Sequence, residues 1–547
     1  MKILVIQLAR LGDILQTLPM IAGLKNKYPE CTVDLVVREK FADAAKVSPH
    51  VDRIVAMPTR SIIGNIVDKG GNVTKEEKTM ALAHLITWVA DEFLEVTHRD
   101  GAYDLTLNCT FSESSSYLAQ VIPSKEVRGL KRAKDGAYAV TDAWGTYIYS
   151  QVLKKNLNII HLNDLFARMA EVNAAAVNPK MDSFDSSTDL GPLVIGMQMG
   201  ASQSSKTLNP KSWSNLASEL LKALPEAHLV LFGSRDDKKQ TKELIDSLDK
   251  SISSRCTSLV GKLRFNHNVS WVKRCHFVIT PDTAMVHLAS LCGVKAINIS
   301  VGGVNPHETG PYGQDHYVLR PRDTSFEVGM PILAEAVISI IMNDVLPQGI
   351  EISKTRIATC SDETTRNILE PVNFTQNEVL NLFQQSYYLL AEFRFGGRLE
   401  DIPVPVIGSS EQVDDLEALK VSIEAMETIR KLGDFGKKYC LKMIENPTDK
   451  AVLTDLGNRI GEIEKLFSTL RSSVFYVRPL VDLWDVQKEN VIGDGIEELA
   501  GFTEGTFREL VQNVDMVHQL IQLALNAAEA KMKTQEERPA ATQSKEI

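Results

Sequence analysis

The sequence has few cysteines and places none of them in a close pair. It contains seven among 547 residues, an odd number, with no Cys-x-x-Cys motif. Disulfide frameworks and structural zinc sites both need such pairing, so the sequence argues against each of them. Long hydrophobic runs are absent too, since none approaches the roughly 20 apolar residues of a membrane-spanning helix. The N-terminus lacks the n-region and cleavage site of a signal peptide, so we expect a reducing, cytoplasmic location.

Basic residues are too few for a protein that binds nucleic acid through its phosphates. Sixty Lys and Arg stand against 70 Asp and Glu, which gives a net charge of −10. A chain with this balance has no overall attraction for a phosphate backbone, and we expect no nucleic-acid partner. The hydrophobic fraction of 44% and the charged fraction of 24% are typical of folded soluble proteins. A chain of this length suggests about three domains.

Short β-type runs alternate with helical patterns through the first 345 residues, which predicts parallel βαβ units. The expected strands are Lys2–Ile6, Thr32–Val37, Ile54–Met57, Tyr103–Asn108, Leu193–Met197, Ala227–Phe232, Phe277–Thr280 and Lys295–Ile299. Between the two sets lies Val172–Gly191, a polar stretch without periodicity that we interpret as a linker. The sequence therefore predicts two doubly wound, Rossmann-like α/β domains, at residues 1–175 and 190–347. Ligands would bind at the carboxyl ends of their strands, in one shared cleft.

Beyond residue 347 the pattern is that of helices only. Thr375 and Glu378 have the spacing of a capping box, and two later segments carry heptad-like hydrophobic spacing. The seam residues are Leu453, Leu456, Ile460, Ile463, Phe467 and Leu470, then Phe507, Leu510, Val514, Val517 and Ile521. We predict a helical bundle or coiled-coil-like module over 350–530, whose helices pack together or bind a second copy or a protein partner. The polar stretch 531–547 is expected to be a disordered tail.

The first expected strand leads directly into Gly12 and Asp13. Gly12 permits a tight turn from strand to helix, which puts Asp13 at the helix N-terminus and at the mouth of the cleft. Asp13 could simply cap the helix by accepting backbone N–H bonds. A carboxylate at the carboxyl end of a strand, facing a second domain, could equally act as a general base.

Three motifs of the second domain carry groups that suit a nucleotide. Lys206 ends the small-residue loop GASQSSK, which could approach a phosphate or be an ordinary surface loop. Asp236 follows a strand and could accept ribose hydroxyls, or only start a helix favourably. Asp282 can cap a helix whose first amides form an anion site. His287 lies one turn further on, either in the core or facing the cleft. The amides of that anion site belong to Thr283, Ala284 and Met285.

In their order, these motifs resemble glycosyltransferase family 9, the heptosyltransferase family with the GT-B fold. The resemblance rests on RLGDILQTLP, GASQSSK, LFGSRDD, PDTAMVHLASLCGVKAINIS and TGPYG, and it covers roughly residues 1–345. It implies an inverting transfer of a sugar from a nucleotide-diphosphate donor, typically ADP-heptose, to a core saccharide of lipopolysaccharide. Some relatives modify proteins instead. It also implies an enzyme of the cytoplasm or of the cytoplasmic face of the inner membrane.

The resemblance assigns roles to individual residues. Asp13 would be the catalytic base, Lys206 a contact of the donor phosphate and sugar, Asp236 a ribose contact and Asp282 a sugar contact. His287 would meet the phosphate–sugar region of the donor. The complete set of implied nucleotide-sugar contacts is Ser202, Lys206, Asp236, Asp282, Thr283, Ala284, Met285 and His287.

The sequence departs from the family pattern at Ala284 and Met285, where Gly and Pro are usual. Their backbone N–H groups can still bind a pyrophosphate, but the altered shape leaves the identity of the donor open. Because the chain has no Asp-x-Asp triplet, a common metal–diphosphate clamp, we expect lysine and helix dipole to replace a catalytic metal. We therefore expect no cofactor besides the co-substrate.

The basic segment Arg128, Lys131 and Arg132 lies in the first domain, where the family binds its acceptor. It could grip phosphates on a lipid-linked saccharide or be a solvated loop. Two further functions stay open at this point. One is a nucleotide-sugar epimerase of the same fold, and the other is an assembly protein whose transferase site is a relict.

Overall fold

The computed structural model of the chain divides into two compact units. The first unit comprises Met1–Ala137 and Ile160–Thr375, and the second comprises Tyr138–Ile159 and Gln376–Ile547. The structure describes residues 1–59, 74–133, 136–140, 142–181, 189–324, 329–359, 365–395 and 413–536. The chain therefore leaves the first unit once, returns to it, and leaves again to complete the second.

The first unit contains two sheets, and its N-terminal sheet is built from parallel strands in the order β3-β2-β1-β4-β5. These strands are β1 (Lys2–Ile6), β2 (Thr32–Arg38), β3 (Arg53–Met57), β4 (Tyr103–Asn108) and β5 (Ser124–Arg132). Ile3–Ile6 of the central strand are fully buried, as expected where helices cover both faces. The order reverses between β1 and β4, so the topological switch point lies at the carboxyl end of β1.

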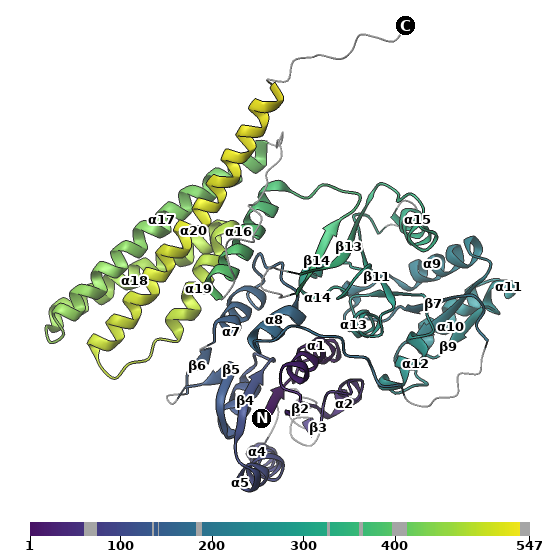
Figure 1. Cartoon of the computed structure of the whole chain (residues 1–547), viewed down its shortest axis with the longest axis horizontal. Coiled ribbons are helices and arrows are strands. Elements are labelled where there is room, and N and C mark those ends of the chain that lie inside the picture. The colour runs from purple at the N-terminus through teal and green to yellow at the C-terminus, as the bar shows by residue number, and fades with distance from the viewer. Residues whose placement is uncertain are drawn as a thin grey trace. The chain divides into compact units, whose positions relative to one another are not determined.

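Helices connect the strands of this sheet. They are α1 (Leu11–Lys27), α2 (Ala42–Ala45), α4 (Lys75–Val89), α5 (Glu95–Asp100), α6 (Glu113–Val121) and, after the excursion into the second unit, α8 (Leu162–Met169). The helix α1 begins at the switch point and packs against α8 (Figure 1). The N-terminus of α1 is thus where this sheet offers a ligand site.

The second sheet has eight strands in the order β14-β13-β12-β11-β10-β7-β8-β9. They are β7 (Leu193–Gln198), β8 (Ala227–Phe232), β9 (Cys256–Ser258), β10 (Phe277–Pro281), β11 (Lys295–Ile299), β12 (Tyr317–Pro321), β13 (Ile350–Thr359) and β14 (Thr365–Pro371). Its helices are α9 (Pro210–Ala223), α10 (Lys238–Ser247), α11 (Lys250–Ser253), α12 (Asn268–Val272), α13 (Ala284–Leu291), α14 (Pro306–Thr309) and α15 (Gly329–Met342). Here the switch point lies between β7 and β10. The prediction of two doubly wound sheets is confirmed.

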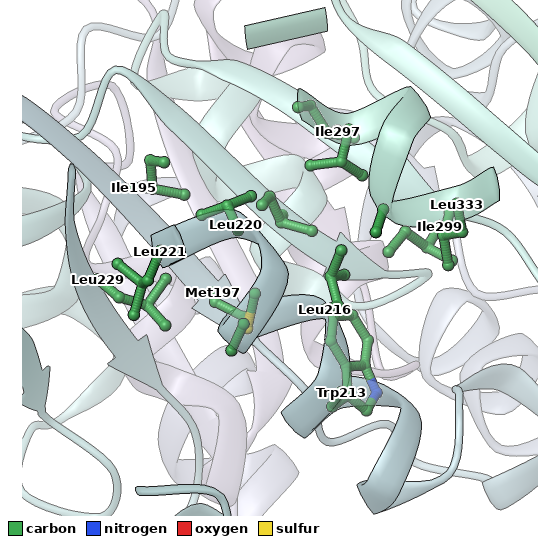
Figure 2. Packing of buried hydrophobic residues seen from close by; sticks show 14 of the residues in the cluster. Ile195, Met197, Trp213, Leu216, Leu220, Leu221, Leu229, Ile297, Ile299 and Leu333 are labelled. Carbon is green, nitrogen blue, oxygen red and sulfur yellow. The ribbon is translucent and has the colours of Figure 1, made fainter. Parts of the chain in front are cut away.

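A hydrophobic core joins the second sheet to the helices on one of its faces. Trp213 of α9 is fully buried there, and its indole N–H donates to the hydroxyl of Thr207 at 3.0 Å. Figure 2 shows the packing around it, with Ile195 and Met197 of β7, Leu216 and Leu220 of α9, and Ile297 and Ile299 of β11. Because Thr207 follows Lys206 directly, the core also fixes the end of the loop that carries this lysine.

The prediction that the chain is helical beyond residue 347 is wrong for residues 350–359 and 365–371. These residues form β13 and β14, which extend the second sheet by antiparallel pairing with β12. Alternate residues such as Ile350 and Ile352 are buried in the same core as Trp213. Ile350 and Ile352 alternate with the polar residues Glu351 and Ser353, which is the period-two pattern of a strand.

The second unit is a helical bundle. Its long elements are α16 (Glu378–Phe395), α17 (Val413–Glu445), α18 (Lys450–Ser473), α19 (Arg478–Glu489) and α20 (Ile496–Glu536), and α17, α18 and α20 are visible as extended rods in Figure 1. Ile463 and Phe467 of one predicted seam, and Phe507, Leu510 and Val514 of the other, join a single core. The seams therefore pack within one chain, and the bundle prediction is confirmed.

Residues 138–159 group with this bundle rather than with the first domain, where the prediction had placed them. They contain β6 (Tyr138–Val140) and α7 (Ala143–Tyr147). The side chain of Asn490 donates to the carbonyl of Val140 and accepts from its N–H, both at 2.8 Å. The side-chain amide of Asn156 donates to the buried carboxylate of Asp482 at 2.9 Å. Such polar ties to the bundle cannot be read from local sequence.

Details of the helix ends also differ from the predictions. The cap of α16 is Asn377, whose side chain accepts the N–H of Leu380 at 2.7 Å, and not Thr375. The last helix continues to Glu536, so the start of the predicted tail is helical. The rest of that tail, 537–547, and part of the predicted linker, 182–188, lie outside the described residues. Among the described residues, no helix combines the length and the apolar character needed to cross a membrane.

We expect Phe467→Ala to destabilise the helical bundle by about 3–5 kcal/mol. Phe467 is 1% exposed, and its ring lies 4.9 Å from that of Trp484 and 6.5 Å from that of Phe507, so truncation leaves a cavity where three helices meet. The neighbouring Leu466 is 49% exposed, and Leu466→Ala serves as the matched control. Urea unfolding followed by far-UV circular dichroism measures both variants. Equal midpoints for the two would contradict the packing described.

Candidate active site

Asp13 lies in the first turn of α1, at the carboxyl end of β1. Its carboxylate accepts the backbone N–H of Arg10 at 2.8 Å, so the capping interpretation of Asp13 is confirmed. Capping does not exhaust its chemistry, because burial raises the pKa of Asp13 above the usual value of an aspartate. The Arg10 N–H and guanidinium oppose this rise, while the Asp282 carboxylate adds to it. A buried carboxylate of raised pKa is a stronger base than an exposed one.

The N-terminus of α1 lies against loops and helices of the second sheet. The guanidinium of Arg10 donates to the hydroxyl of Ser202 at 3.2 Å, which joins the loop after β1 to the loop after β7. A Cβ atom at Gly12 would come within 3.1 Å of the His287 ring, so glycine allows α1 to approach α13 closely. Residues from the carboxyl ends of both sheets therefore meet, as the sequence predicted.

His287 is one of the groups packed into this junction. It is 7% exposed, and burial lowers the pKa of His287 to about 4, so the imidazole is neutral at physiological pH. The ring thus supplies bulk and one possible hydrogen bond, but no positive charge. Its predicted contact with the donor stays a prediction.

Lys206, Asp282 and Thr309 form a polar chain at the edge of the second sheet. The ammonium group of Lys206 lies 3.0 Å from one carboxylate oxygen of Asp282, and the hydroxyl of Thr309 donates to the other at 3.3 Å. The side chain of Asp282 is 9% exposed and that of Lys206 is 27% exposed. Asp282 is thus held from both sides, and Lys206 keeps an accessible face for an anionic ligand.

The N-terminus of α13 differs in one respect from the predicted anion site. Thr283, not Asp282, is the N-cap, and its hydroxyl accepts the N–H of Met285 at 3.3 Å. Thr283 has the extended backbone of a capping residue, while Asp282 is engaged by Lys206. The amide of Met285 is therefore already bonded. The described residues provide no such bond for the amides of Thr283 and Ala284.

Asp236, the predicted ribose contact, is exposed, while its neighbour Asp237 is built into the loops after β7 and β8. The carboxylate of Asp237 accepts the N–H of Ser234 at 2.7 Å and its hydroxyl at 2.8 Å. A Cβ atom at Gly200 would lie 2.0 Å from one carboxylate oxygen of Asp237, and a Cβ atom at Gly233 would lie 2.9 Å from the other. Sequence reasoning missed Asp237. The sequence signal that could have indicated Asp237 is the pair Gly200 and Gly233, each of which follows one of two neighbouring strands.

The basic residues predicted to bind the acceptor belong to the strand β5 and are not a loop. Arg128 lies 3.2 Å from the carboxylate of Glu171, and Arg132 lies 3.1 Å from that of Glu113. Both guanidinium groups are therefore paired within the protein. Lys131 is half-buried at the carboxyl end of the strand. An acceptor contact from these three residues stays a prediction.

Arg38, the last residue of β2, is a further residue that sequence reasoning missed. Its guanidinium donates to the carbonyl of Ala9 at 2.6 Å, directly before the turn that carries Arg10 and Asp13. Burial lowers the pKa of Arg38, and the nearby Asp13 carboxylate opposes that effect. Two arginines, Arg10 and Arg38, thus lie near the half-buried carboxylate of Asp13. Metal ligands are not gathered anywhere in the described ranges, where no three His, Cys, Asp or Glu side chains are placed to hold an ion.

Comparison with known proteins agrees with these motifs. Residues 96–330 match the model of glycosyltransferase family 9 (heptosyltransferase). Lipooligosaccharide heptosyltransferase 2 of Haemophilus influenzae is 23% identical over 328 residues, which cover 58% of this chain and 88% of that protein. Lipopolysaccharide heptosyltransferase 1 of Pseudomonas aeruginosa is 22% identical over 332 residues, covering 58% of this chain and 83% of that protein.

Two solved structures align with about the same share of the chain. The glycosyl transferase family 9 protein of Veillonella parvula has 17% identity and a TM-score of 0.49, covering 63% of this chain and 98% of that one. The E. coli heptosyltransferase WaaC with ADP has 17% identity and a TM-score of 0.47, covering 63% of this chain and 100% of that one. The helical bundle from Glu378 onwards lies beyond the family match. Residues 96–330 thus match glycosyltransferase family 9, the named relatives support a glycosyltransferase, and an additional C-terminal helical region follows the match.

Proposed function

We propose that this glycosyltransferase moves a heptose from a nucleotide-diphosphate donor, ADP-heptose, to a saccharide acceptor of the lipopolysaccharide core. The reaction inverts the anomeric centre and uses no metal. The relatives named above support the sugar and the acceptor, since both are heptosyltransferases of lipooligosaccharide or lipopolysaccharide. The observation that carries the proposal is the junction of Asp13 with the Lys206–Asp282 pair, because a base and a diphosphate site must serve the same anomeric carbon.

Asp13 is the group that would activate the acceptor. Its ionised carboxylate takes the proton of an acceptor hydroxyl, and the acceptor oxygen bonds to the anomeric carbon while the bond from that carbon to the diphosphate oxygen breaks. Attack from the face opposite the leaving group inverts the centre, through a transition state with oxocarbenium character. Burial assists Asp13, since a raised pKa strengthens it as a base.

The departing diphosphate needs positive charge, and two groups of the second sheet can supply it. Lys206 offers a partly exposed ammonium group. The first turn of α13 offers the amides of Thr283 and Ala284 together with the positive end of the helix dipole. Fixed charges and dipoles aimed at a developing negative charge lower the barrier without reorganising, which is the work a metal ion does in other enzymes. We place the reaction in the cytoplasm or at the cytoplasmic face of the inner membrane.

Asp13→Asn should lower turnover by about 10²–10⁴-fold with donor affinity little changed. Asparagine can still accept the Arg10 N–H through its amide oxygen, so the cap survives while the base is lost. Steady-state kinetics and donor binding by calorimetry measure the two quantities separately. Near wild-type turnover would return Asp13 to capping alone.

The dependence of wild-type kcat/KM on pH gives a second test of Asp13 as the base. The base works only when ionised, so kcat/KM should fall as the pH drops through the raised pKa of Asp13, above the range of an ordinary aspartate. Arg10 and Arg38 act against that rise, and Asp282 acts with it. The residual activity of Asp13→Asn should lack this acid limb.

Lys206→Ala should weaken donor binding and lower turnover together, because the lysine charge faces the diphosphate in the ground state and in the transition state. Lys222→Ala is the matched control, since Lys222 pairs with Glu219 at 3.1 Å on α9, in the same sheet's helical layer. Calorimetric titration with ADP compares the two. Unchanged ADP affinity in Lys206→Ala would show that the loop carrying Lys206 does not contact the donor.

Wild-type activity should persist in excess EDTA, because lysine and helix dipole take the role of a divalent cation. Initial rates with and without the chelator, and after adding back Mg²⁺ or Mn²⁺, measure this. Strong inhibition that either ion reverses would refute the metal-free mechanism.

A further inference from the structure

The segment Thr309–Gly313 links α14 to β12 and begins at the residue that holds Asp282. The carbonyl of Gly310, next to Thr309, accepts a hydrogen bond from Nε2 of His161 at 3.0 Å. The other ring nitrogen of His161 accepts the N–H of Asn163 at 3.1 Å, which fixes the proton on Nε2. Burial lowers the pKa of His161 to about 3, so this neutral tautomer persists across the physiological range.

Tyr312 is the centre of the same segment, and it is anchored at both ends. Its backbone N–H donates to the hydroxyl of Ser290 on α13 at 3.1 Å. Its phenol donates to a carboxylate oxygen of Asp164 on α8 at 2.7 Å. The His161 ring lies 5.0 Å from the tyrosine ring, centroid to centroid. Tyr312 therefore connects a helix that covers the first sheet with a helix of the second.

Asp164 receives a second bond, from a strand that the sequence did not reveal. The backbone N–H of Asn367 on β14 donates to the other carboxylate oxygen of Asp164 at 2.8 Å. The Asn367 side chain in turn donates to the carbonyl of Pro311 at 3.2 Å and accepts the N–H of Gly313 at 3.0 Å. Every residue from Thr309 to Gly313 thus has a bond to a distant element.

Burying a carboxylate at this place is costly. Asp164 is 2% exposed, and burial raises its pKa to about 6 even though Asn367, Arg168 and Tyr312 favour the charged form. A well-packed apolar pair would stabilise the fold equally well, so stability alone does not account for a buried charge. What an apolar pair could not supply is direction: each carboxylate oxygen faces one donor, which fixes the segment in one position.

We propose that Asp164 and Tyr312 are positioning residues for donor binding: by clamping Thr309–Gly313 they hold the Thr309 hydroxyl against Asp282 and so orient that carboxylate for the donor sugar. This inference rests on the proposed function, in which Asp282 contacts the sugar. Tyr312 acts on Asp282 indirectly, because the segment that begins at Thr309 lies between them. In this proposal β14 contributes Asn367, which bonds to Asp164, Pro311 and Gly313.

A double-mutant cycle tests the proposal in the full chain, with ADP-heptose and ADP as calorimetric probes. Tyr312→Phe removes the phenol, and Thr309→Val removes the hydroxyl at nearly constant volume. Each should weaken ADP-heptose binding by about tenfold, the size expected for one hydrogen bond to a charged group. The double variant should be no weaker than the worse single variant, because both act on Asp282 through one path. ADP affinity should change far less, since ADP lacks the sugar.

Tyr103→Phe is the matched control. The phenol of Tyr103 donates to the carboxylate of Asp34 at 2.6 Å in the same unit, but at the amino end of β4. This variant loses the same kind of bond and should bind ADP-heptose as the wild type does. Thr309→Ser retains the hydroxyl and should restore most of the affinity lost in Thr309→Val. If Tyr312→Phe does not fold, Ser290→Ala removes another anchor of Tyr312 and carries the same cycle.

The outcomes separate the two proposals. Suppose that the wild type binds ADP-heptose and that Tyr312→Phe binds it with the same affinity. This result would overturn the clamp and leave the proposed function intact. Multiplying losses in the double variant, or an equal loss in Tyr103→Phe, would also overturn it, since either indicates general destabilisation. A wild type that binds no ADP-heptose would overturn both.

Discussion

The close contact of α1 with α13 is the constraint on which the arrangement of the site depends. Gly12 lets the His287 ring approach α1 to a distance that any side chain at position 12 would disturb. Arg10 and Ser202 add a hydrogen bond between the loops after β1 and β7. Because α1 starts at the switch point of one sheet and α13 beside that of the other, this contact brings the carboxylate proposed as the base, Asp13, near Lys206 and the amides of Thr283 and Ala284. Neither sheet holds a complete site by itself.

The path of the chain makes the helical bundle inseparable from the transferase unit by simple truncation. Residues 138–159 belong to the bundle, yet they lie in sequence between β5 and α8 of the first unit. A chain ending near residue 347 would leave that insertion without its partner helices and would also lose β13 and β14. Binding of a second copy or of a protein partner by the helical bundle stays a prediction. All residues to which we assign a role in the reaction lie in the first unit.

Sequence reasoning performed best where the signal was local. The eight predicted strands, the start of α1 and the loop ending in Lys206 all follow from hydrophobic runs, glycines and capping residues that neighbours in sequence supply. It failed where two options were locally equal. Asp282 and Thr283 can both cap α13, and only the bond of Asp282 to Lys206, 76 residues away, decides between them. Asp236 and Asp237 are also equivalent in the local sequence, and only the structure shows that Asp237 is the one that packs against Gly200; a ribose contact from Asp236 stays a prediction.

By itself the sequence determined the alternation of strands and helices, the family motifs and the candidate base, because these depend on residue type and short spacing. Only the tertiary structure decided which charges are paired, which amides stay free and which side chains are buried. Arg128 and Arg132 illustrate this, since their charge is evident from the sequence but their partners Glu171 and Glu113 come from other elements. The buried Asp164–Tyr312 bond spans 148 residues. Electrostatic and hydrogen-bonding partners are set by proximity in space, and proximity across such separations arises only when the core has formed.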